Sequence, residues 1–76
     1  MDKLKVPCGV CVAGEYVYVT NRDSHTLAVY TTEGVYVLSL GQYGRKEGQF
    51  NIPTGVVVDK DGFVYICDSN DRVQVF

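Results

Sequence analysis

The chain has 76 residues, which is short for an independent domain, and its formal net charge of −2 is too weak to indicate or exclude a polyanionic partner. Hydrophobic residues make up 46% and charged residues 21%, a globular composition that argues against disorder. No apolar run approaches the roughly 20 residues of a membrane helix, and no apolar stretch typical of a signal peptide precedes Pro7. Three cysteines, an odd count, favour a reducing, cytoplasmic compartment over a disulfide framework.

Segments rich in Val and Tyr, separated by breaks that contain Gly, predict an all-β chain. In chain order, we expect strands at 9–12, 16–20, 26–30, 35–40, 55–59, 63–67 and 72–76. Thr32-Glu33-Gly34 and Lys60-Asp61-Gly62 have the composition of hairpin turns, in which Gly supplies the positive φ. The stretch 41–53 is expected to be the long loop between two groups of strands.

The same pattern occurs twice along the chain. Three stretches recur at a spacing of 46 or 47 residues: 6–12 with 52–58, 17–20 with 64–67, and 27–30 with 73–76. We therefore expect one complete four-stranded repeat over 1–52 and three strands of a second over 53–76. Because the strands near Val56 and Val64 are almost continuously apolar, we expect cover on both of their faces. Four-stranded antiparallel sheets with this period are typical of β-propeller blades.

At this point the residues resemble a known family. Residues 53–76 (PTGVVVDKDGFVYICDSNDRVQVF), with the preceding Gly48-Gln49-Phe50-Asn51, are similar to the NHL repeat. The first copy is more divergent: Arg22, Ser24 and Thr26 stand where the second has Asp68, Asn70 and Arg72. The resemblance implies a propeller of about six blades. Most similar are the propellers of tripartite-motif ubiquitin ligases, which bind protein or RNA.

The resemblance implies a function in binding. The chain lacks the cysteine and histidine array of a RING domain, so we expect no ligase activity from it. We expect a non-catalytic module without a cofactor, whose partner is a protein or single-stranded RNA. Without a fourth strand in the second repeat, the strand at Arg72–Phe76 would have an unpaired edge, through which the chain could self-associate.

If the strands of a repeat are named A to D, the B–C and D–A loops meet at one end of the blades. We call this end the loop face, and its longest loops make it the candidate binding surface. The candidate binding residues are Arg22, His25, Tyr43, Arg45, Lys46, Phe50 and Arg72. The cations would contact phosphates and the aromatic rings would stack on bases. The four Arg and Lys residues in this set are balanced in number by four acidic residues on the same loops: Asp23, Glu47, Asp68 and Asp71. A solvated rim of mixed charge, with Arg72 paired to a nearby acid, is therefore the alternative.

The sequence contains little evidence for a catalytic, redox or metal site. Cys8 and Cys11 form a C-x-x-C, but Thr54 and Val57 occupy these positions in the second copy, so buried strand cysteines are the better interpretation than a metal or redox site. Asp23, Ser24 and His25 are adjacent in sequence, which is not how a catalytic triad is normally assembled. Two alternatives to a binding module stay open: a fragment of a metal-dependent lyase or hydrolase propeller, and a self-assembling propeller-building fragment.

Overall fold

The computed structural model of the chain describes residues 6–69 and 72–76, so residues 1–5 of the first predicted repeat, and Asn70 and Asp71 of the second, lie outside it. Seven strands are present: β1 (Pro7–Ala13), β2 (Tyr16–Asn21), β3 (Thr26–Thr31), β4 (Tyr36–Leu40), β5 (Gly55–Val58), β6 (Val64–Asp68) and β7 (Arg72–Val75). These bounds confirm the predicted all-β class, with four strands followed by three. Among the described residues, no helix is long and apolar enough to cross a membrane.

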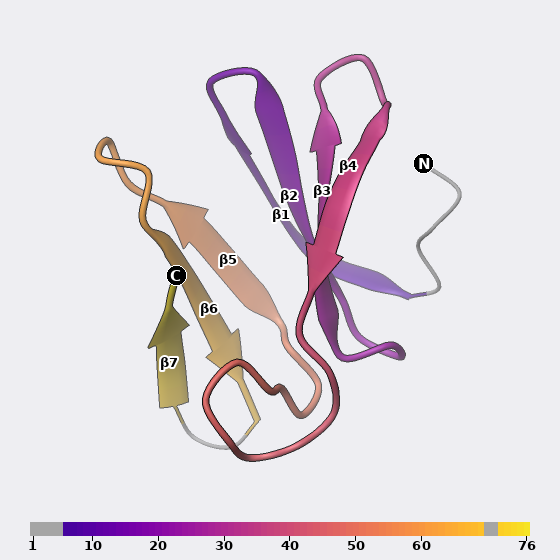
Figure 1. Cartoon of the computed structure of the whole chain (residues 1–76), viewed down its shortest axis with the longest axis vertical. Coiled ribbons are helices and arrows are strands. Elements are labelled where there is room, and N and C mark those ends of the chain that lie inside the picture. The colour runs from indigo at the N-terminus through magenta and orange to yellow at the C-terminus, as the bar shows by residue number, and fades with distance from the viewer. Residues whose placement is uncertain (1–5, 70–71) are drawn as a thin grey trace.

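The strands form two antiparallel sheets in chain order. The first sheet is β1-β2-β3-β4 and the second is β5-β6-β7 (Figure 1). The β1–β2, β3–β4 and β5–β6 turns lie at the upper end of the molecule in Figure 1, and the β2–β3 and β4–β5 connections lie at the lower end. The predicted separation of turns from loops is therefore present, because every step between neighbouring strands is a hairpin.

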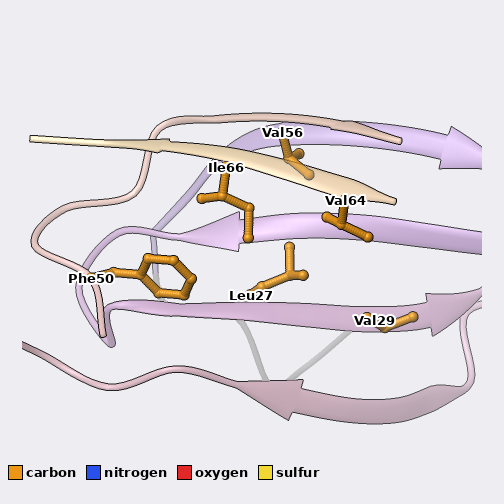
Figure 2. Close-up of a cluster of buried hydrophobic side chains, with 6 residues drawn as sticks. All are labelled: Leu27, Val29, Phe50, Val56, Val64 and Ile66. Atoms are coloured by element: carbon orange, nitrogen blue, oxygen red, sulfur yellow. The ribbon is translucent and has the colours of Figure 1, made fainter. Parts of the chain in front are cut away.

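The hydrophobic core lies between the two sheets. Leu27 and Val29 of β3 face Val64 and Ile66 of β6, while Phe50 of the long loop lies at one end of the cluster, on the left in Figure 2. This is the face-to-face stacking of consecutive propeller blades. A second buried cluster lies on the opposite face of the first sheet and consists of Val17, Val19, Ala28 and Tyr30.

The closest approach between the sheets is near Gly9 of β1. A Cβ atom there would fall on the carbonyl oxygen of Thr54, so the backbones meet without an intervening side chain. The buried hydroxyl of Thr20 accepts a hydrogen bond from Gly9 N at 2.8 Å and donates to Thr54 O at 3.0 Å. One hydroxyl thus links strands β1 and β2 to the chain that enters β5.

Two expectations about burial are wrong. The second sheet is covered on one face only: Val57, Val73 and Val75 on its other face are 61%, 57% and 54% exposed. Continuous apolar runs predicted cover on both faces, but among the described residues nothing packs against this side. The cysteines are free and not buried, because Cys8 and Cys67 are exposed and Cys11 is only partly covered at the edge of the core.

Candidate binding face

The loop face is organised around His25. Its Nδ1 accepts a hydrogen bond from Ile52 N at 3.0 Å, which joins the β2–β3 loop to the β4–β5 loop. The ring also meets Tyr43 edge to face, with centroids 4.8 Å apart and planes at 62°. His25 therefore orders the two predicted binding loops relative to each other and presents Tyr43 beside it.

Four candidate residues reach solvent on these loops. Tyr43 is 66% exposed, so its ring is open to contact from outside the chain. Arg22, Arg45 and Lys46 are also exposed. Together with the half-buried His25, these residues give the loop face an aromatic platform with cationic side chains on the same loops. Asp23 and Glu47 are exposed there as well.

Arg72 has a structural role. Its guanidinium donates to three carbonyl oxygens of the β4–β5 loop: Arg45 O at 2.7 Å, Lys46 O at 3.0 Å and Gln49 O at 2.6 Å. Its Nε lies 3.5 Å from the Asp68 carboxylate, which is the acid pairing considered in the sequence. These bonds occupy the head group, so Arg72 anchors the loop that carries Arg45 and Lys46.

Phe50 does not fit its predicted role. Its side chain is 0% exposed and packs in the core, where its ring meets Phe76 edge to face at 5.8 Å between centroids. The ring is therefore unavailable for stacking on a base, because the loop folds inward between the two sheets. The sequence showed an aromatic residue in a polar loop but not the direction in which the side chain points.

Two glutamines that were not considered in the sequence also hold this loop. Gln74 of β7 accepts from Gly48 N at 2.9 Å and donates to Gln49 O at 2.5 Å, while Gln49 accepts from Lys46 N at 3.1 Å. The sequence signal for this role was Gln74, a polar residue on the face of β7 that points toward the core. Together with Arg72, these bonds fix the loop backbone, while the side chains of Tyr43, Arg45 and Lys46 stay exposed to solvent.

The described residues contain no group of three or more His, Cys, Asp or Glu side chains placed to hold a metal ion. Asp59 and Tyr65 form a hydrogen-bonded pair at the opposite end of the second sheet from the loop face. Tyr65 Oη donates to Asp59 Oδ2 at 2.8 Å, which lowers the pKa of Asp59 and raises that of Tyr65.

Comparison with known proteins identifies the same family that the sequence resembles. Residues 50–76 match the NHL repeat. The chain is 48% identical over 48 residues to E3 ubiquitin-protein ligase TRIM71 of Rattus norvegicus, a match that covers 62% of this chain and 6% of that protein. It is 42% identical over 43 residues to B-box type zinc finger protein ncl-1 of Caenorhabditis elegans, covering 55% of this chain and 5% of that protein.

A third relative is Protein brain tumor of Drosophila melanogaster, 37% identical over 43 residues, which are 55% of this chain and 4% of that protein. The matched stretch of the chain thus covers only about one twentieth of the length of these curated relatives. The resemblance of this chain to the NHL repeat, and to proteins of the TRIM71 type, is therefore confirmed.

Proposed function

We propose that the chain is part of a non-catalytic propeller module that binds a macromolecule through its loop face, and that this partner is single-stranded RNA. The observation that carries the proposal is the exposed Tyr43 ring, held by His25 on a loop with Arg45 and Lys46. A base stacks on an exposed ring, and neighbouring cations contact the phosphates on either side. The similarity to TRIM71 supports a binding role for the NHL repeat.

One ion pair of the loop face lies within the fold and leaves the other cations of this face for contact with a partner. Asp68 is buried and paired with Arg72, so neither side chain is available to a partner. The exposed cations Arg22, Arg45 and Lys46 are available for phosphate contacts, and the exposed acids Asp23 and Glu47 lie on the same loops. The loop backbone is held by Arg72 and Gln74, which lowers the conformational entropy lost when a strand of RNA binds.

A salt titration with a single-stranded RNA of about ten nucleotides tests this function. The logarithm of the binding constant should fall linearly with the logarithm of the salt concentration, with a slope of about −0.7 for each phosphate contact. Tyr43→Ala should weaken binding roughly tenfold, because one base loses its stacking partner. Lys46→Ala should reduce the salt slope by about the value of one contact.

Lys60→Ala is the matched control, because Lys60 is also an exposed lysine but lies in the β5–β6 turn at the opposite end of the sheets. This variant should bind as the parent chain does. An absence of binding at low salt, or an equal loss in Lys60→Ala and Lys46→Ala, would contradict the RNA proposal. A protein ligand that loses affinity with Tyr43→Ala would then be the favoured partner.

A further inference from the structure

The imidazole of His25 joins the two loops of the loop face in one protonation state only. Its Nδ1 accepts a hydrogen bond from Ile52 N at 3.0 Å, and an imidazole nitrogen accepts only when it carries no proton. The bond therefore assigns a neutral ring with its proton on Nε2. We call this bond the histidine junction. It depends on a side chain that can gain a proton, since histidine ordinarily changes charge between about pH 5 and 8.

Neighbouring hydrogen bonds of the long loop have acceptors that do not titrate in this range. Phe50 N donates to Gln42 O at 2.7 Å, and Gly48 N donates to Gln74 Oε1 at 2.9 Å. Carbonyl and side-chain amide oxygens remain acceptors whether the solution is neutral or mildly acidic. A proton taken up by His25 would therefore act on the histidine junction and leave these other bonds of the loop in place.

The β2–β3 loop offers an added proton no partner of opposite charge. Among the described residues, the ion pair joins Arg72 to Asp68, and no acid pairs with the ring of His25. On the loop itself, Asp23 is exposed to solvent, and Arg22 is a cation whose carbonyl oxygen accepts from His25 N at 3.3 Å. The contacts within this loop therefore do not compensate a charged imidazole.

Two groups of the long loop face the ring. Tyr43 meets it edge to face with centroids 4.8 Å apart, and the N–H of Ile52 points at Nδ1. The Tyr43 ring would attract an imidazolium, but that contact does not replace the acceptor that Ile52 N loses. A proton on Nδ1 would face the Ile52 N–H, so two donors would meet where one hydrogen bond stood. Protonation therefore separates the two loops at this point.

The backbone at the histidine junction is held in a conformation that relaxes when the bond is lost. His25 and Ile52 both have a φ of +54°, and a β-branched residue keeps such a conformation only where its surroundings hold it. The bond from Ile52 N is a direct link between these two residues. Without it, Ile52 can return to negative φ, and the His25 ring no longer keeps a fixed position beside Tyr43.

We propose that protonation of His25 opens the histidine junction and thereby regulates the loop face. The two loops are ordered while the ring is neutral and loosened once the ring carries a second proton. Tyr43 then loses the neighbour that holds it as a stacking platform. The effect on RNA rests on the proposed function, whereas the opening of the junction is a property of the chain alone.

Amide hydrogen exchange, followed by NMR on the 76-residue chain at about pH 7.5 and about pH 5, tests the opening directly. The protection of the Ile52 amide, relative to an unstructured chain at the same pH, should fall about tenfold or more at the lower pH, because one hydrogen bond is lost. The Phe50 amide is the internal reference, because its acceptor is a backbone carbonyl of the same loop. Its protection should change less than about threefold.

His25→Asn is the matched variant. The Asn side-chain oxygen accepts a hydrogen bond without titrating, and Asn adopts positive φ more readily than most residues. Protection of the Ile52 amide in this variant should therefore be the same at both pH values. Unchanged protection of Ile52 in the parent chain, or an equal loss in His25→Asn, would overturn the proposal.

The RNA measurement compares Tyr43→Ala with the parent chain at the same two pH values. The variant should weaken binding of the single-stranded RNA roughly tenfold at the higher pH and less than about threefold at the lower, because a ring that is not held stacks poorly. The ratio of affinities is compared because a charged His25 also adds a cation near the phosphates. Equal ratios at the two pH values would overturn the regulation. Absence of RNA binding at both would contradict the proposed function, while the exchange of Ile52 still decides whether the junction opens.

Discussion

At the scale of single residues, backbone strain coincides with the junction of the binding loops. His25 and Ile52 both adopt a φ of +54°, a left-handed conformation that residues other than Gly rarely adopt and that is most unusual for a β-branched residue such as Ile52. These two residues are joined by the bond from Ile52 N to His25 Nδ1. Residues in such conformations persist where the surrounding structure holds them, and here that structure is the loop face.

Asp59 shows how one side chain specifies a turn. Its Oδ1 accepts from Asp61 N at 2.9 Å and Phe63 N at 3.0 Å, and its Oδ2 accepts from Tyr65 Oη. The tyrosine bond contributes most to lowering the pKa of Asp59 below its usual 3.8, and backbone N–H donors, including those of Phe63 and Asp61, add to it. The carboxylate is thus stabilised in its charged form in the folded chain.

This shift predicts a pH dependence of stability. Because the folded pKa of Asp59 is lowered, its contribution is complete above the ordinary pKa of 3.8 and is lost as pH falls through the folded value. Asp59→Asn keeps an acceptor for the turn but does not titrate. Urea unfolding between pH 2 and 6 should therefore show a shallower acid loss of stability for Asp59→Asn than for the parent. Parallel pH curves for the two proteins would refute the assignment.

At the scale of elements, the two sheets depend on one glycine for their closest contact. Gly9 and Gly55 occupy the same position in the two repeats, yet a Cβ atom at Gly55 would meet only Cys67 at 3.9 Å, an ordinary contact. The two glycines are therefore equivalent in the sequence repeat but lie in different environments. Gly9 touches the next unit, and Gly55 lies on the exposed side of the second sheet.

Replacing each glycine by alanine should separate these environments. Gly9→Ala should destabilise the chain by about 1–3 kcal/mol, because the methyl group forces the Thr54 carbonyl away from β1. Gly55→Ala should change stability by less than about 1 kcal/mol, since it fills open space and restricts the unfolded chain. Chemical denaturation of both variants measures the difference. Equal losses in the two would show that the junction at Gly9 is not a close contact.

At the scale of the whole molecule, the exposed face of the second sheet repeats a face that is covered in the first. Val57, Tyr65 and Val75 correspond to Cys11, Tyr18 and Val29, which pack against the core beneath the second sheet. The exposed set is apolar and lies on three adjacent strands. Such a patch favours association, because burial of apolar surface is the main driving force between proteins.

We accordingly expect the 76-residue chain to self-associate with rising concentration. Val57→Lys places a charge on the exposed face and should shift sedimentation toward the monomer. Thr32→Lys adds the same charge in the exposed β3–β4 turn and should leave the association unchanged. If Val57→Lys associates as strongly as the parent chain, the face of the second sheet is not the contact. The predicted edge at Arg72–Phe76 would then be the alternative.

The sequence alone determined the strands, the hairpin turns and the repeat, because these depend on alternation, on glycine and on residues close in the chain. Tertiary structure decided which candidate residues are available. Phe50 is buried and Arg72 is bound to carbonyl oxygens of the long loop, whereas Tyr43 stays exposed. Each outcome depends on contacts between residues distant in sequence, such as Arg72 with Arg45, or Phe50 with Phe76. Local sequence patterns do not reveal such contacts. These contacts determine the direction in which a loop side chain points.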